Sequence, residues 1–175
     1  MDEPTRNRLK GRKILFDRNS KVLEELSQII LTSSKRVLIV WSFHFVEELL
    51  NSINELNPDE KRLNEAYQVV KDWAKGKVLM PEAKKAILAC HQLAKVAGNE
   101  VLTSYYHAIG QGLSVVHTEK HALGLPIYEL SGIVKSDPKN YAEQVKKKVE
   151  EYISVLNELN ALPSIEYLQF AHFIK

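Results

Sequence analysis

The feature that most constrains the fold is the spacing of apolar residues in WSFHFVEELLNSINEL, residues 41–56. Apolar side chains recur there at steps of three and four residues, which places them on one face of an α-helix. They are Phe43, Val46, Leu49, Leu50, Ile53 and Leu56. The β-branched residues of KRVLIVWSF run directly into this period, so they provide little evidence for a strand.

Capping signals predict a second helix directly after the first. The run Asn57–Glu60 offers a residue that can cap, a proline suited to the first helical position, and two acids that favour the positive helix end. Asp59 and Arg62 are three residues apart, so we expect them to pair on the first turn. Gly76 is a natural left-handed stop. The predicted buried face contains Leu63, Ala66, Val69, Val70 and Trp73.

Further helical segments follow along the chain. One opens at Pro81, and the next runs from about Glu100 through Val116 after a break at Gly98–Asn99. Another follows Asp137–Pro138, and a terminal amphipathic piece follows Pro163. The segment after Pro81 has a face of mostly small residues, comprising Ala83, Ala86, Ile87, Cys90, Leu93, Ala94 and Ala97.

Together these elements predict an all-α, multi-helix bundle in a single domain. Residues 1–35 are expected to form an N-terminal extension with one helix, residues 36–136 the helical core, and residues 137–175 helices packed on that core. The residues up to about position 20 are expected to be loosely held.

Composition excludes several classes of function. The chain has 175 residues, enough for one domain, and its net charge of +2 gives no general attraction to nucleic acid. A single cysteine excludes an internal disulfide and fits a reducing cytoplasm. No apolar run approaches the roughly 20 residues of a membrane span, and the N-terminus lacks the apolar core of a signal peptide. We therefore expect a cytoplasmic protein with neither a nucleic-acid nor a membrane partner.

The segment HAIGQGLSVVHTEKHALGLPIYEL, residues 107–130, concentrates histidine and glycine. His117 and His121 are four residues apart, and on one helix face such a pair can share a metal ion. Thr118 stands where a zincin motif has glutamate, and His107 points elsewhere. We interpret the pair as helix-end residues with polar partners, expect no bound cofactor, and keep a metal site at His117 and His121 as an alternative.

The glycines of this segment are interpreted as packing positions. Gly110 and Gly112 lie within a helical period, where each costs about 1 kcal/mol relative to alanine. We expect them to admit a neighbouring helix at close range, such as the small-residue face of residues 83–97. Tyr128 is expected in the core or at its rim. Cys90 falls on an apolar stripe, which favours packing over catalysis.

Two stretches of the chain resemble a known bacterial pattern over about residues 36–134. They are NPDEKRLNEAYQVVKDWAKGK and the run from AILACHQLAKVAG through HAIGQGLSVVHTEKHALGLPIYEL. The matching positions are Pro58, Asp59, Arg62, Ala66, Trp73 and Gly76 in the first, and Ala108, Gly110, Gln111, Gly112, His117, His121, Ala122, Gly124 and Tyr128 in the second. They are similar to the class-five-like immunity domain of bacterial polymorphic-toxin systems. Gly112 replaces the usual alanine, and Pro126 is expected to interrupt the last helix.

This resemblance implies a cytoplasmic all-α protein, not an enzyme, that binds and neutralises a toxin by stoichiometric complex formation. It carries over no catalytic residue. Two other hypotheses stay open: a metal-dependent helical-bundle enzyme using His117 and His121, and a homo-oligomeric structural or signalling module. A homodimer is also compatible with the leading hypothesis.

Overall fold

The computed structural model describes residues 2–162 and 170–174, and all the regular structure in these two ranges is helical, which confirms the predicted all-α class. The elements in chain order are α1 (Glu3–Leu9), η1 (Lys21–Leu23), α2 (Glu24–Thr32), α3 (Lys35–Leu56), α4 (Arg62–Ala74), α5 (Met80–Val96), α6 (Glu100–Ser114), η2 (Glu119–His121), α7 (Gly124–Ser136) and α8 (Tyr141–Ala161).

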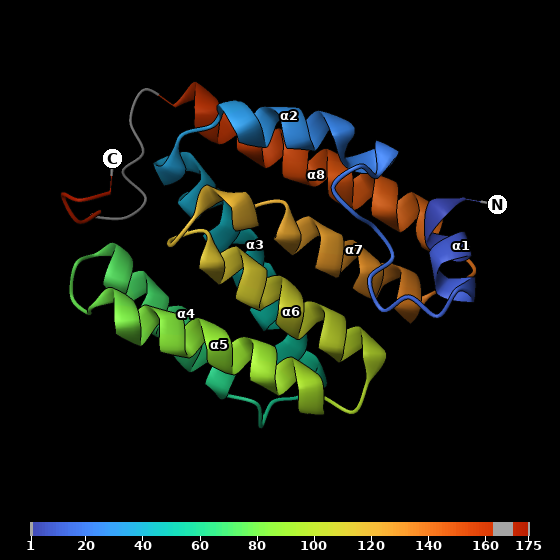
Figure 1. Ribbon diagram of the computed structural model, residues 1–175, viewed down its shortest axis with the longest axis horizontal. Helices are drawn as coiled ribbons and strands as arrows, with labels where there is room; N and C mark the ends of the chain where they lie inside the picture. Colours follow the sequence, from blue (N-terminus) through green and yellow to red (C-terminus); the bar gives the residue numbers. More distant parts are fainter. Residues whose placement is uncertain (1, 163–169, 175) are drawn as a thin grey trace.

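The helices form a bundle with α6 at its centre. In Figure 1, α2 and α8 lie side by side along one edge, α4 and α5 form the opposite edge, and α3 runs behind α6 and α7. The contacts agree, because α6 packs against α7, α5 and α3, and α8 packs against α2, α3 and α7. Each of α4–α5 and α5–α6 is an antiparallel hairpin closed by a short connection.

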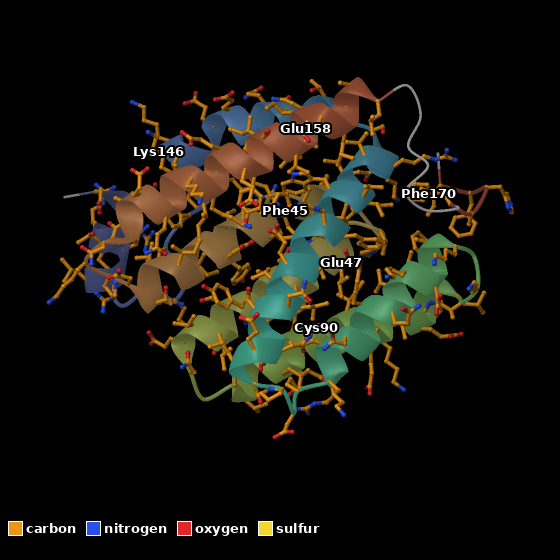
Figure 2. All side chains as sticks on the ribbon, turned by 180° about the vertical axis from the view of Figure 1, so that it is seen from behind. Phe45, Glu47, Cys90, Lys146, Glu158 and Phe170 are labelled. Carbon is orange, nitrogen blue, oxygen red and sulfur yellow. The ribbon has the colours of Figure 1, made fainter. Side chains whose placement is uncertain are left out.

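Helix α3 supplies the largest part of the core. Trp41, Phe43 and Phe45 are fully buried, and the Phe45 ring lies 4.5 Å from that of Tyr152 in α8. The predicted apolar stripe of α3 is buried except at its end, where Leu56 is exposed. Figure 2 shows Phe45 directed between α3 and α8, while Lys146 and Glu158 project from the outer face of α8.

The N-terminal segment is more ordered and more helical than expected. Residues 1–35 contain two α-helices instead of one, and Leu15 and Phe16 are buried in the core. The Leu15 amide donates to Ser131 Oγ at 2.9 Å, and Asn7 Nδ2 donates to the Leu15 carbonyl at 2.9 Å. The expectation of a loosely held start was wrong because these apolar side chains are buried in the core and the Leu15 backbone is hydrogen-bonded to Ser131 of α7 and Asn7 of α1.

The predicted start of the second helix was also wrong in detail. Asn57–Glu60 is a turn closed by the Glu60 amide on the Asn57 carbonyl at 3.1 Å, and α4 begins only at Arg62. Pro58 therefore occupies the second position of a turn, where its fixed φ fits equally well. Arg62 pairs with Glu60 rather than with the exposed Asp59.

Other boundaries follow the predicted signals. Gly76 ends α4 with a φ of +76°, and Asn99 caps α6 by accepting from the amides of Val101 and Leu102. Pro126 does not interrupt α7: it lies in the first turn, where the amide it lacks has no partner within the helix.

The amphipathic piece predicted after Pro163 falls largely outside the described residues. Its described end, residues 170–174, forms a turn against the end of α4. There the Ala171 amide donates to the Ala74 carbonyl at 2.8 Å, and Phe173 packs on Trp73 at 5.3 Å.

Candidate functional site

The α5–α6 hairpin brings two histidines into contact. His91 and His107 are each eight residues from the capping residue Asn99, one before it and one after it. Antiparallel helices place such positions side by side, and the Nδ1 atoms of the two rings lie 3.0 Å apart. One imidazole must therefore donate and the other accept, with at most one proton between them.

Glycine creates the space for this pair. A Cβ on Gly110 of α6 would come within 2.6 Å of the His91 ring, so only glycine lets the imidazole of α5 lie on the α6 backbone. A Cβ on Gly112 would come within 2.7 Å of the side chains of Val46 in α3 and Leu125 in α7. The predicted packing role of Gly110 and Gly112 is thus confirmed, although only Gly110 faces α5.

His117 and His121 lie in the connection between α6 and α7, as predicted for helix-end residues. They do not share a helix face, because α6 ends at Ser114 and His117 follows in a turn. Their rings are stacked with centroids 6.0 Å apart. His121 Nδ1 lies 2.9 Å from Gln111 Oε1, and since that oxygen only accepts, the imidazole donates.

The environment keeps all four of these histidines uncharged near neutral pH. Burial, reinforced by the charges of His107, His121 and Lys95, lowers the pKa of His91 to about 4. Burial is also the main cause of the lowered pKa values of His107, His117 and His121. The result is a row of neutral imidazoles along one side of the bundle.

A pocket of about 350 Å³ opens at the His107 end of this row. Its walls come from α5, α6, α7 and the N-terminal segment, and they include Lys13, Ile14, Lys95, Ser104, His107, Tyr128 and Lys135. The Tyr128 ring lies on the His107 ring at 5.0 Å. The Lys135 ammonium donates to the Lys13 carbonyl at 2.7 Å and to Ser104 Oγ at 2.8 Å. The pocket therefore presents several hydrogen-bond donors within a lining that is mainly apolar.

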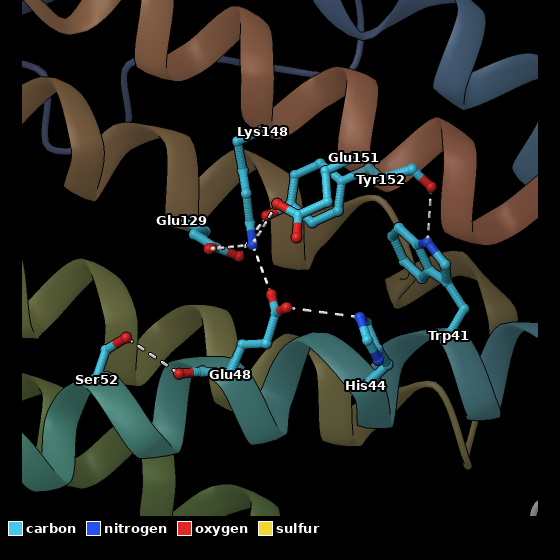
Figure 3. A network of polar contacts seen from close by, with 8 residues as sticks. All are labelled: Trp41, His44, Glu48, Ser52, Glu129, Lys148, Glu151 and Tyr152. Atoms are coloured by element: carbon cyan, nitrogen blue, oxygen red, sulfur yellow. Dashed lines mark hydrogen bonds and ion pairs between the residues drawn. The ribbon is translucent and has the colours of Figure 1, made fainter.

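A second polar cluster lies between α3, α7 and α8 (Figure 3). The Lys148 ammonium contacts Glu48 at 2.7 Å, Glu151 at 3.1 Å and Glu129 at 3.5 Å, and Tyr152 donates to the buried Glu129. Burial alone would lower the pKa of Lys148, but the charges of Glu129 and Glu48 outweigh it and raise the pKa. This lysine is held charged among carboxylates, as befits a structural network.

A third feature is an open groove of about 600 Å³ between α4 and α5. Ala66, Ala86 and Ala89 contribute to its lining, with Arg62 and Glu65 among its charged residues. Arg62 is held by a two-pronged ion pair, its Nε donating to Glu60 Oε1 at 2.8 Å and its Nη2 to Oε2 at 2.5 Å.

The structure thus brings together one part of the predicted residues and separates the rest. Gly110, Gln111, His121 and Tyr128 belong to the histidine row or its pocket, and His117 stacks at the end of the row. The others lie elsewhere: Asp59 and Arg62 at the start of α4, and Trp73 buried at its end.

Sequence reasoning missed His91, His107 and Lys135. For the two histidines a signal existed, because their equal distances from Asn99 place them opposite each other once residues 83–116 are interpreted as a helical hairpin. Nothing local marks Lys135, since its surroundings are assembled from the distant residues Lys13 and Ser104.

Two features of the described residues concern the metal site and the membrane span considered from the sequence. Within residues 2–162 and 170–174, no group of three or more His, Cys, Asp or Glu side chains is placed to hold a metal ion. No helix in the described part of the chain combines the length and apolarity needed to cross a bilayer.

These observations define a helical protein with a preformed, donor-rich pocket. Comparison with protein families identifies the kind of protein: the model described as "Imm-5 like putative immunity protein" matches residues 28–158. The chain belongs to this family, and the resemblance seen in the sequence is confirmed over a longer span. Searches of curated proteins and of solved structures find no match.

Proposed function

We propose that this protein is an immunity protein that binds a cognate bacterial toxin in the cytoplasm and neutralises it by forming a stoichiometric complex. The observation that carries the proposal is the family match, which covers α3 through α7 and most of α2 and α8. The mechanism is occlusion of the toxin's active site or of a surface it needs, without turnover.

The geometry supports a binding role. The helices that carry the histidine row are fixed by close packing at Gly110 and Gly112, so the pocket beside the row is already formed before any partner arrives. A preformed surface loses little conformational entropy on association, which favours tight complexes. Cys90, the one thiol, is buried in the core, and burial raises its pKa to about 12, which disfavours a nucleophilic role.

The test is co-expression with the toxin encoded beside this gene. We expect the protein to restore growth of cells making that toxin, and to elute with an inactivated toxin as a complex of defined stoichiometry in size-exclusion chromatography with light scattering. An unrelated toxin serves as the control. Neither protection nor a complex with the neighbouring toxin would refute the proposal.

A further inference from the structure

We infer that the pocket between α5, α6, α7 and the N-terminal segment is a receptor for a carboxylate, and that it takes an aspartate or glutamate side chain of the partner protein. This inference rests on the proposed function for the identity of the partner. The carboxylate preference itself follows from the pocket alone and can be tested without a toxin.

The first argument is the state of Lys135. Its ammonium is half-buried and donates to two neutral acceptors, the Lys13 carbonyl and Ser104 Oγ. Among the residues that the structure describes, no carboxylate lies within ion-pair distance of it. An ammonium has three donors, so one N–H of Lys135 is left for a ligand.

The second argument is that other donors in the pocket are also unused. The pairing of His91 with His107 occupies one ring nitrogen of each, and in residues 2–162 and 170–174 no partner is found for Nε2 of His107. The Tyr128 hydroxyl likewise has no hydrogen-bond partner in those ranges, and it lines the same pocket as His107 and Lys135. All three residues line one pocket, and their donors together match an acceptor with several lone pairs, which a carboxylate supplies.

The histidine pair can adapt to such an acceptor. When His91 Nδ1–H donates to His107 Nδ1, the Nε2 of His107 carries the proton and can donate to the ligand. The reverse arrangement leaves Nε2 without a proton. A bound carboxylate therefore selects the first arrangement, and His91 acts as the positioning residue that fixes the His107 tautomer.

The remaining walls suit a short apolar stem. Ile14 and Ala94 line the pocket beside the Tyr128 ring, so the methylenes of an acidic side chain can lie against apolar atoms while its head reaches Lys135. Lys13 and Lys95 add positive charge, against the single acid Glu100 in the lining. A volume of about 350 Å³ accommodates one side chain.

The first experiment titrates the free protein with acetate and, separately, with inorganic phosphate, following backbone and imidazole resonances by NMR. We expect saturable chemical-shift changes confined to Ser104, His107 and Tyr128. The affinity obtained from them should be higher for acetate than for phosphate. Lys135→Gln should weaken acetate binding at least fivefold, while Lys135→Arg should retain acetate binding. Lys146→Gln, on the outer face of α8, is the matched control and should change nothing. Diffuse, unsaturable shifts, or tighter binding of phosphate, would overturn the carboxylate assignment.

The second experiment measures the complex with the toxin. Lys135→Glu should raise the Kd at least tenfold through charge repulsion, and Lys146→Glu should leave it unchanged. A toxin complex that forms equally well with Lys135→Glu would overturn the inference and leave the proposed function intact. A wild-type protein that binds acetate but no toxin would contradict the proposed function and leave the carboxylate pocket standing.

Discussion

The two polar clusters of this bundle differ in whether carboxylates neutralise their lysine. Around Lys148, a cation with 15% of its side chain exposed meets Glu129, Glu48 and Glu151, and its ammonium also lies 4.7 Å from the Phe45 ring centre. Around Lys135, the ammonium donates only to neutral acceptors and makes no ion pair with a described residue, with Glu100 the one acid in the pocket lining, and the nearby histidines are uncharged. A cation whose charge is matched within the protein stabilises the fold, whereas one left unmatched beside an open pocket is available to a ligand.

The largest effect should come from breaking the matched cluster. Lys148→Met leaves Glu129 buried without its cation, which should lower the free energy of unfolding by about 3 kcal/mol. The measurement is urea denaturation, with Lys146→Met on the same helix as a control that stays within about 0.5 kcal/mol of wild type. A double variant, Lys148→Met with Glu129→Gln, should recover part of the loss. A Lys148→Met variant with the same free energy of unfolding as wild type would contradict the structural role of this cluster.

A smaller loss of stability is expected from substituting Gly110, which leaves room for the histidine pair. Gly110→Ala places a methyl group against the His91 ring. The energetic cost of this overpacking should exceed the gain from helix propensity by about 1–2 kcal/mol. The sharper measurement is a double-mutant cycle in urea. When His91→Ala removes the ring, the same Gly110→Ala should become neutral or stabilising. Equal costs in both backgrounds would show that the close approach does not matter.

The histidine pair should also make stability depend on pH. His91 has a folded pKa of about 4, below its unfolded value near 6.5, so the unfolded chain binds more protons between these values. Stability is therefore complete above pH 6.5 and should fall by about 1–2 kcal/mol as the pH drops towards 4. Unfolding of wild type and His91→Gln across this range isolates the effect, since the variant should lose less on acidification. Parallel pH profiles would refute it.

The smallest effect is predicted for the unmatched cation. Lys135→Gln should change the free energy of unfolding by less than about 0.5 kcal/mol, because the side chain makes no ion pair with a described residue and water can replace it in the pocket. Thermal and urea unfolding measure this directly. A loss comparable with that of Lys148→Met would mean that Lys135 is structural, and the contrast between the two clusters would disappear.

Most of the fold could be predicted because its signals are local. The apolar period of α3, Gly76 and the Asn99 cap each act within a few residues. Where two local solutions compete, prediction failed: Pro58 suits both a first helical turn and the turn it occupies. The order of the N-terminal segment depends on Ser131, more than a hundred residues away, and no local pattern reveals such a partner.

The candidate site was less predictable for the same reason. Glu129, a lone charge within the apolar run LPIYELSGIV, signals a buried acid that needs a cation, but only tertiary packing shows that the cation is Lys148. Gln111 was singled out from the resemblance, and His121 from the resemblance and from its spacing to His117, and the structure adds the hydrogen bond between Gln111 and His121. Their role in binding a partner stays a prediction.

The attachment of the N-terminal segment has a consequence for how such a protein can diversify. Lys13 and Ile14 complete one wall of the pocket, yet they lie before residue 28, where the family match begins. Both side chains are exposed, whereas the neighbouring Leu15 and Phe16 are buried in the core. Substitutions at Lys13 or Ile14 can therefore change the charge and shape of the pocket wall while the core keeps its packing.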